Sequence, residues 1–187
     1  MLYFITSSKN KFVEARAILG DIEQLDIDLP EIQDIDSKNI IRAKLLEALK
    51  HKRGGLASSQ LGRSGLIVED TSLHFNCLNG LPGPLIKWFL GALKNDGLFK
   101  IVERFGDDRV EAKTIIGYAQ NEKEIYFFEG SARGRIVAPR GETNFGWDPI
   151  FLPDGYDKTF AEMSREEKNK ISMRRLALNK LKKFLDK

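Results

Sequence analysis

Two acids directly follow an apolar run near the middle of the chain. Residues 66–68 are Leu, Ile and Val, and Glu69, Asp70 and Thr71 come next. The run predicts a strand buried on both faces of a sheet, and we expect the acids where that strand leaves the core. In open α/β sheets, ligands bind at the carboxyl ends of strands. Because neighbouring strand residues point to opposite faces, one acid could face a ligand while the other holds structure. A solvated turn is the alternative.

A hydroxyl-rich turn near the start could hold phosphate. The apolar residues 2–5 predict a strand, and Thr6, Ser7 and Ser8 separate it from a predicted helix that carries Lys11 and stops at Gly20. A helix N-terminus offers unpaired N–H groups and the positive end of the helix dipole. Together with the hydroxyls and lysines this makes a candidate phosphate cradle. The simpler alternative is that one serine only caps the helix.

A further acid and a further lysine follow in the next predicted elements. Alternating apolar residues predict a half-buried strand over 22–29, which ends just before Glu31. Asp36 or Ser37 can cap the next helix, which we expect to end at residues 54–55. Lys44 lies at the edge of that helix's apolar stripe. The sequence thus places a second acid at the end of a predicted strand.

An aromatic loop late in the chain has the residue types of a base-binding site. It contains Phe145, Gly146, Trp147 and Asp148. Aromatic faces stack on bases, which contributes about 1–3 kcal/mol per base, and an aspartate accepts hydrogen bonds from ring N–H groups. The alternative is a small hydrophobic cluster beneath a turn.

The last predicted helix places cations on its inward face. Ser164 and Glu167 have the spacing of a capping box, and an apolar stripe continues to residue 185 as one helix. Arg174 falls on this stripe, where a guanidinium requires an anion or another acceptor. Lys168, one turn before Ile171, begins the same face.

The remaining pattern indicates an α/β protein of one domain. An apolar helix follows the turn at residues 81–84, and two strands over 110–119 and 125–129 form a β-hairpin, with 131–137 extending or bending the second. The 187 residues are 42% hydrophobic and 30% charged and contain one cysteine. That cysteine excludes an internal disulfide. The first residues lack a signal or membrane-spanning pattern, so we expect a cytoplasmic protein with no membrane partner.

The net charge of +3 is unevenly distributed. Residues 158–187 contain ten Lys and Arg and four acids, a net charge of +6. A basic tail favours an anionic partner, although a solvated helix face explains scattered lysines equally well. An RNA-binding module that uses this tail with Phe145 and Trp147 is one alternative, but acids at strand ends would repel a nucleic-acid backbone, so we expect no nucleic-acid partner.

Over nearly its whole length the chain resembles the inosine triphosphate pyrophosphatase (Ham1-like) family. The matching segments occur in family order: residues 6–11, 29–31, 68–71, 81–84, 134–141, 145–149 and 160–169. The resemblance implies a single domain over residues 1–187. It also implies an elongated mixed β-sheet flanked by helices, with two lobes around a central cleft, and a homodimer. The implied activity is Mg²⁺-dependent hydrolysis of non-standard purine triphosphates (ITP, dITP, XTP) to the monophosphate and pyrophosphate.

The resemblance also implies roles for individual residues. Asp70 would be the catalytic carboxylate that binds or orients Mg²⁺ and the attacking water, and Glu31 a second metal-linked acid. Thr6, Lys11 and Lys44 would hold the triphosphate, and Phe145, Trp147 and Asp148 would bind the purine. Lys168, Ser172 and Arg174 would close the site. The other expected substrate contacts are Ser7, Ser8, Thr71, Gly146 and Met173.

Two positions depart from the family pattern and leave alternatives open. The family usually has Asn where this chain has Ser8, and its Ser-His-Arg reads Ser172, Met173 and Arg174 here. Methionine cannot replace a histidine hydrogen bond to the base. The alternatives are a nucleotide-binding homologue with weakened catalysis and a pyrophosphatase with relaxed or altered base specificity.

Overall fold

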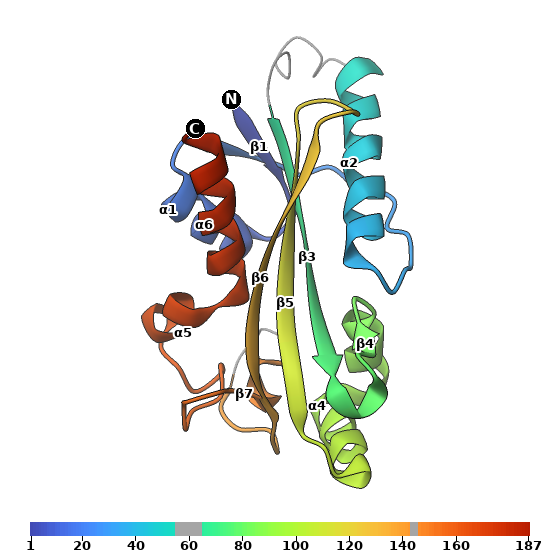
Figure 1. Ribbon diagram of the computed structural model, residues 1–187, viewed down its shortest axis with the longest axis vertical. Helices are drawn as coiled ribbons and strands as arrows, with labels where there is room; N and C mark the ends of the chain where they lie inside the picture. Colours follow the sequence, from blue (N-terminus) through green and yellow to red (C-terminus); the bar gives the residue numbers. More distant parts are fainter. Residues whose placement is uncertain (55–64, 143–145) are drawn as a thin grey trace. The chain divides into compact units, whose positions relative to one another are not determined.

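The computed structural model describes residues 1–54, 65–142 and 146–187 and has a mixed α/β fold (Figure 1). Its sheet has seven strands in the order β2-β1-β3-β5-β6-β7, and β4 pairs with β3 beside this path. The strands are β1 (Leu2–Ile5), β2 (Ile22–Leu25), β3 (Gly65–Phe75), β4 (Pro82–Gly83), β5 (Arg109–Ala119), β6 (Ile125–Ile136) and β7 (Phe151–Pro153). The helices are α1 (Lys9–Leu19), α2 (Ser37–Gly54), α4 (Ile86–Phe105), α5 (Arg165–Ile171) and α6 (Met173–Leu185), with short 3₁₀ turns η1 (Asn76–Leu78) and η2 (Asp148–Ile150).

The chain divides into two compact units. Unit 1 comprises Met1–Asp70, Thr114–Gly130 and Arg174–Lys187, and unit 2 comprises Thr71–Lys113 and Ser131–Met173. The boundaries fall within β3, β5 and β6, so each long strand contributes residues to both units. The predicted single domain and the cleft between two lobes stay predictions.

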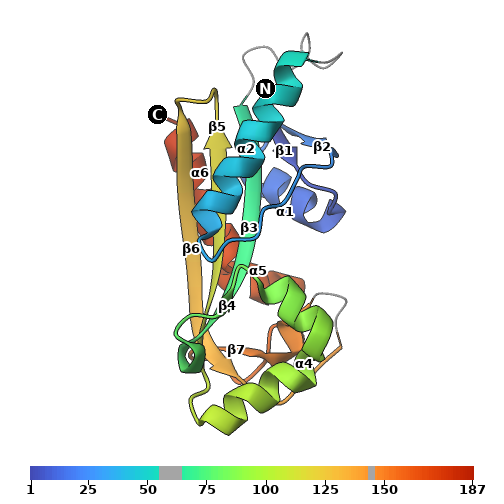
Figure 2. The same ribbon diagram turned by 90° about the vertical axis from the view of Figure 1, so that its right-hand side faces the viewer.

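Unit 1 buries a core on each face of its part of the sheet (Figures 1 and 2). β1 pairs in parallel with both β2 and β3. Alternate residues of β3 point to opposite faces, so Leu66 and Val68 pack with residues of α2, while Ile67 packs with residues of α1 and α6. β3 is therefore covered on both faces in unit 1, which explains its continuous apolar run.

Unit 2 has its own core beneath α4. Leu98 and Val102 of α4 pack there with Trp147, Phe151 and other buried residues of β3, β5 and β6. β7 pairs antiparallel with β6. The short loop and η2 that precede β7 thereby place the Trp147 and Asp148 side chains inside this unit, where they are 4% and 2% exposed, respectively.

Several sequence predictions are confirmed. Residues 2–5 form a strand, α1 follows the hydroxyl-rich turn and ends before Gly20, and β5 and β6 are neighbours joined by a short turn. α2 begins at Ser37. The capping box at Ser164 and Glu167 is present at the start of α5. Apart from these predictions, no helix among the described residues is long and apolar enough to cross a membrane.

Three predictions are corrected. The strand predicted over 22–29 ends at Leu25. β3 does not end at the acids but continues through them to Phe75, because cations from two helices compensate the buried Glu69. The single terminal helix is two helices, because Ser172 has an extended backbone with ψ 138°. The predicted stripe consequently divides, with Ile171 packing against the core of unit 2 and Leu178 in a core of unit 1.

Candidate functional site

Glu69 and Asp70 lie side by side in the middle of β3 and have different partners. Glu69 has the same strand parity as Ile67, on the face covered by α1 and α6, and contacts Lys11 and Arg174. Asp70 has the opposite parity and interacts with Ser37 and Lys44, both on α2. The prediction that the two acids serve different environments is confirmed.

The Glu69 carboxylate is the centre of a buried cluster of four charges in unit 1. Its Oε1 atom lies 2.8 Å from Lys11 Nζ and accepts a hydrogen bond of 3.1 Å from Arg174 Nη2. Its Oε2 atom accepts from Arg174 Nε at 2.9 Å, and Arg174 Nη1 donates to Glu14 Oε2 at 2.9 Å. The cluster joins α1, β3 and α6. The prediction that Arg174 meets an anion is confirmed, and the anions are these two carboxylates.

The charges of this cluster stabilise one another. Burial by itself would raise the pKa of Glu69, but the positive charges of Arg174 and Lys11 and their hydrogen bonds outweigh burial and lower this pKa to about 2. The pKa of Arg174 is raised: burial opposes its charge, and Glu69 and Glu14 more than compensate. Both side chains are therefore ionised throughout the physiological pH range.

Asp70 is half-buried, and its charge is compensated much more weakly than that of Glu69. Desolvation raises its pKa, and the nearby charge of Glu31 acts in the same direction, while a hydrogen bond with Ser37 and the charges of Lys44 and Lys11 oppose the increase. Its Oδ2 atom is buried and has no hydrogen-bond partner among the described residues. A buried acceptor without a partner is costly, so this oxygen marks a position where a ligand group would be stabilised.

A small pocket of unit 1 brings several of the predicted phosphate and metal residues together. It has a volume of about 160 Å³, and its lining includes Thr6, Glu31, Lys44 and Glu69. Lys44 Nζ forms an ion pair with Glu31 across the pocket's edge, and the Glu31 side chain is 41% exposed. A lysine paired with a partly exposed acid can exchange that acid for a phosphate oxygen when a ligand enters.

The hydroxyl-rich turn has a defined hydrogen-bonding pattern. Ser8 caps α1, with its hydroxyl accepting from the Lys11 backbone N–H at 3.4 Å, and the Ser8 N–H donates to Thr6 Oγ1 at 3.1 Å. Ser7 is exposed. The capping alternative therefore applies to Ser8, and its phosphate contact stays a prediction. Thr71 is half-buried at the start of unit 2.

The described part of the aromatic loop, residues 146–148, belongs to unit 2, and its Asp148 forms an ion pair. Lys168 of α5 pairs with Asp148, and its ammonium lies 5.1 Å from the centre of the Phe160 ring. Trp147 lies edge-on to Phe151, with ring centres 5.5 Å apart, so the hydrophobic-cluster alternative describes Trp147. Base stacking stays a prediction, and Phe145 lies outside the described residues.

The other predicted base-binding residues flank this pair or the break between α5 and α6. The Gly146 carbonyl accepts a hydrogen bond from Asn95 Nδ2 at 3.1 Å. Ser172 and Met173 are buried, at 3% exposed each, and Met173 belongs to the core of unit 2. Arg174 belongs to unit 1, where its guanidinium binds carboxylates. A contact of these residues with a base stays a prediction.

Sequence reasoning did not assign site roles to Glu14, Ser37 or Glu69. Glu14 follows Lys11 by three residues and so lies on the same face of α1, a spacing visible in the sequence. Ser37 was expected only as a possible helix cap. Glu69 was expected as one of two acids without an assigned role, because its partner Arg174 lies 105 residues away.

The carboxylates of unit 1 suit a magnesium ion whose coordination is completed by waters and by the phosphates of a substrate. Among the described residues no group of three or more His, Cys, Asp or Glu could hold a metal ion. Mg²⁺, however, is usually held by one or two carboxylates together with waters and substrate phosphates. Asp70 has an oxygen without a partner among the described residues, and the partly exposed Glu31 is a second oxygen donor in the same unit. The donor set therefore suits this ion.

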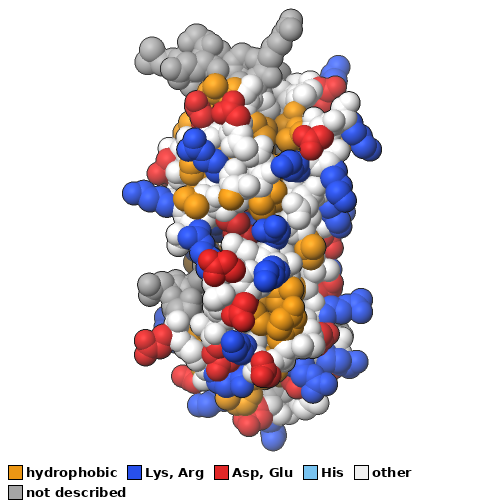
Figure 3. Space-filling view, turned by 90° about the vertical axis from the view of Figure 1, so that its left-hand side faces the viewer, with side chains coloured by type: hydrophobic (Ala, Val, Ile, Leu, Met, Phe, Trp, Pro, Cys, Tyr) orange, Lys and Arg blue, Asp and Glu red, His pale blue; other side chains and the backbone are white. Residues whose placement is uncertain are grey.

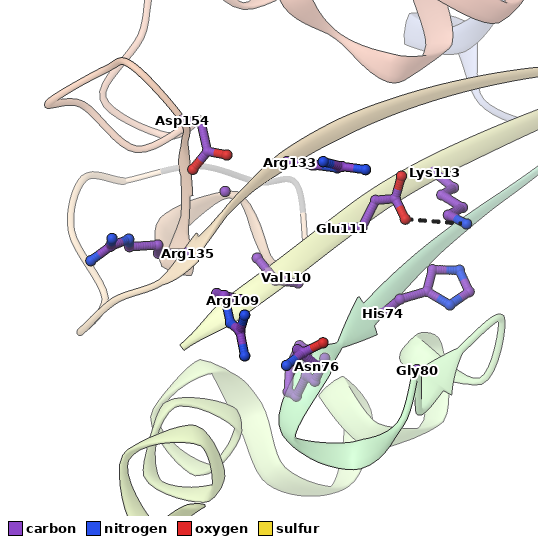
Figure 4. Close-up of a pocket in the computed structure, with 12 residues that line it drawn as sticks. His74, Asn76, Gly80, Arg109, Val110, Glu111, Lys113, Arg133, Arg135 and Asp154 are labelled. Carbon is purple, nitrogen blue, oxygen red and sulfur yellow. Dashed lines mark ion pairs between the residues drawn. The ribbon is translucent and has the colours of Figure 1, made fainter. Parts of the chain in front are cut away.

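A larger pocket in unit 2 contains none of the predicted site residues. It has a volume of about 650 Å³ and is lined by residues of β3, β5 and β6 and of neighbouring turns (Figure 4). Its cations lie close to acids: Lys113 Nζ is 3.2 Å from Glu111, and Arg109 donates to Asp107 at 2.7 and 2.8 Å. The lining contains four cations and two acids, but these contacts already pair Lys113 and Arg109 with acids, and we assign no ligand to the pocket.

Known structures share this fold. The Ham1 protein of Staphylococcus aureus superposes with a TM-score of 0.78 at 28% identity, covering 100% of this chain and 98% of that chain. A Ham1 protein from Coxiella burnetii superposes with a TM-score of 0.81 at 25% identity, covering 100% of this chain and 99% of that chain. The fold is thus the open mixed sheet of the Ham1 proteins.

The sequence gives the family as well. A model of the Ham1 family matches residues 2–184. Inosine triphosphate pyrophosphatase of Schizosaccharomyces pombe is 40% identical over 99% of this chain and 95% of its own length, and that of Aspergillus fumigatus is 42% identical over 99% and 94%. The corresponding protein of Ajellomyces capsulatus is 44% identical over 97% and 94%. The chain belongs to the Ham1 family.

Proposed function

We propose that the protein is a nucleoside triphosphate pyrophosphatase that acts on non-standard purine nucleotides. It hydrolyses ITP, dITP or XTP with one water to the nucleoside monophosphate and pyrophosphate. The family relationship supports this reaction type. In this chain, the observation that supports the reaction is the buried Asp70 Oδ2 atom, which has no partner among the described residues. Asp70 lies in the same unit as Lys11, Lys44 and Glu31.

In the proposed reaction, Asp70 acts on the attacking water. Its Oδ2 atom accepts a hydrogen bond from the water, orients the water oxygen toward the α-phosphorus and takes up the proton. The new bond joins the water oxygen to the α-phosphorus, and the bond from this phosphorus to the oxygen bridging to the β-phosphate breaks. A pKa raised by burial makes this carboxylate a better base.

Lysines of unit 1 bind the charge that develops on the leaving pyrophosphate. Lys11 and Lys44 supply ammonium N–H donors, and the turn at Thr6 and Ser7 supplies hydroxyls. Mg²⁺, which would be held by Glu31 and by the Asp70 oxygen that does not take up the proton, would supply Lewis-acid neutralisation of phosphate charge. When the triphosphate arrives, Lys44 turns from Glu31 toward phosphate oxygens, because a phosphate carries more negative charge than a single carboxylate.

The base is recognised by polar groups of unit 2. Asp148 accepts a hydrogen bond from a ring N–H, and Lys168 holds that carboxylate in place and donates toward the 6-keto oxygen. Adenine has an amine in place of this carbonyl, and a donor left without its acceptor disfavours it. Three further parts of the proposal stay predictions from the sequence. They are recognition of the base by Ser172 and Arg174, a homodimer, and a cytoplasmic location.

A panel of nucleotides tests the proposal. The purified protein is incubated with Mg²⁺ and, separately, ITP, dITP, XTP, ATP and GTP, and the products are separated into pyrophosphate and orthophosphate. We expect pyrophosphate from the 6-keto purines that lack a 2-amino group, and much less from ATP and GTP. Orthophosphate as the product, or equal rates with all five, would contradict it. ITP binding without product would favour the catalytically weakened alternative, to which Ser8 and Met173 point.

A further inference from the structure

Glu69 has contacts that a scaffold acid in a strand does not need. Its side chain is 3% exposed, and it bonds with the ammonium of Lys11 and with two nitrogens of Arg174. Lys11 lies in the first turn of α1, directly after the hydroxyl-rich turn of residues 6–8. Glu69 therefore determines where the Lys11 ammonium lies in relation to that turn.

The cluster as a whole is neutral, so its contribution is not attraction of a polyanion. Glu69 and Glu14 carry two negative charges, and Lys11 and Arg174 carry two positive charges. The intact cluster therefore adds no net positive charge to unit 1. What it adds is a fixed position, because Arg174 ties Glu69 of β3 to Glu14 of α1, and so holds the helix that carries Lys11.

Fixing a lysine has a defined benefit for binding. Ordering a lysine side chain costs conformational entropy, because its long chain has many rotamers. An ammonium has three N–H donors, and Glu69 occupies one while the side chain remains 27% exposed. A lysine that is ordered before the ligand arrives can donate to phosphate oxygens without that cost.

We propose that Glu69 is a positioning residue of the phosphate site, which fixes the Lys11 ammonium for the triphosphate with Arg174 as its anchor. This inference rests on the proposed function, since it assumes that Lys11 binds the triphosphate. A positioning role and a purely electrostatic role predict opposite changes in triphosphate affinity when the charge of Glu69 is removed. Removing the Glu69 charge makes the cluster more positive, which would strengthen triphosphate binding if charge mattered most, and weaken it if position matters most.

The test is a double-mutant cycle on KM for ITP. The variants are Glu69→Gln, Lys11→Met and the double variant. A Gln side chain is uncharged and has one acceptor oxygen in place of two, so it cannot make the three contacts that Glu69 makes with Lys11 and Arg174. We expect Glu69→Gln to raise KM about tenfold, which corresponds to about 1.4 kcal/mol, with kcat within about threefold of the wild type. The double variant should have the KM of Lys11→Met alone, because Glu69 acts through Lys11.

Matched controls use the ion pair drawn in the pocket of Figure 4. Glu111→Gln and Lys113→Met make the same chemical changes at a Glu–Lys pair that lies outside the proposed site, and we expect them to leave KM unchanged. If Glu69→Gln does not fold, Glu69→Asp retains the charge but shortens the side chain by one methylene. That variant should also raise KM, by a smaller factor, while its unfolding midpoint remains close to that of the wild type.

The outcomes separate the inference from the function. A lower KM in Glu69→Gln, an unchanged KM in both Glu69 variants, or KM effects of Glu69 and Lys11 that simply add would overturn the positioning role while the wild type remains active. An inactive wild type would contradict the proposed function instead. The same cycle is then carried out on the dissociation constant for ITP by titration calorimetry, with the same expected factors.

Discussion

The carboxyl groups of Glu69 and Asp70 lie on opposite faces of β3, and their pKa values are shifted in opposite directions. On one face, three short contacts with Lys11 and Arg174 lower the pKa of Glu69 to about 2. On the other, burial raises the pKa of Asp70, and its Oδ2 atom has no partner within the described part of the chain. A fully compensated carboxylate stabilises structure, whereas an incompletely compensated one is available for chemistry. This difference supports the proposed catalytic role of Asp70 and the proposed positioning role of Glu69.

The largest expected effect is loss of turnover in Asp70→Asn. An amide cannot take up the proton of the attacking water, so kcat should fall by about 10²–10⁴-fold. Because burial raises the pKa of Asp70, the ionised group destabilises the fold at neutral pH, and the variant should unfold at the same or a higher temperature. Pyrophosphate release and thermal unfolding measure the two quantities. Asp154→Asn, at an exposed acid of the pocket in unit 2, is the control. Wild-type turnover in Asp70→Asn would remove Asp70 from the mechanism.

The next effect concerns stability and belongs to Glu69. Breaking a buried ion pair costs about 3–5 kcal/mol, so Glu69→Gln should lower the free energy of unfolding at pH 7, and Glu111→Gln should lower it far less. The pKa of Glu69 falls from 4.5 to about 2 on folding, so its stabilisation is complete above the unfolded value and disappears as pH falls toward 2. Roughly 3 kcal/mol follows from this shift.

Urea unfolding between pH 7 and pH 3 measures how much the ionised Glu69 contributes to the free energy of unfolding. The stability difference between the wild type and Glu69→Gln should narrow as the pH is lowered. A difference that stays constant over this range would show that the charge of Glu69 does not contribute.

A smaller effect should follow from Asp148→Asn in unit 2. Asn donates as well as accepts, so it discriminates less between a ring N–H and a bare ring nitrogen. The ratio of kcat/KM for ITP to that for ATP should fall about tenfold, or 1.4 kcal/mol. Asp157→Asn, at an exposed acid elsewhere in unit 2, is the control. An unchanged ratio would show that Asp148 holds Lys168 without reading the base.

The smallest expected effect is that of Ser8→Asn. Asn caps helices as well as Ser does, so the unfolding free energy should change by less than about 0.5 kcal/mol. The added amide can donate to phosphate, and KM for ITP should fall a few-fold. Ser164→Asn makes the same change at the cap of α5 as a control. A higher KM in Ser8→Asn would show that the serine suits this chain's substrate better.

Local pattern predicted much of this molecule, and its failures have physical causes. The strand over residues 2–5, the cap at Ser8 and the capping box at Ser164 depend on neighbours in sequence and were found. The continuation of β3 through Glu69 was missed, because the compensating Arg174 is distant in the chain. The break at Ser172 was missed because Ile171 and Leu178 keep helical spacing while packing in different cores. The acids and lysines of the proposed site can be suggested from residue type, but their pairing cannot, because the partners are far apart in the sequence.

The most direct test of these assignments compares kcat and KM of Asp70→Asn and Glu69→Gln in one pyrophosphate-release assay with ITP and Mg²⁺, at equal concentrations of folded protein. The account predicts that Asp70→Asn loses at least about a hundredfold in kcat, while Glu69→Gln changes mainly KM. Equal losses of kcat in the two variants, or a larger loss in Glu69→Gln, would contradict it.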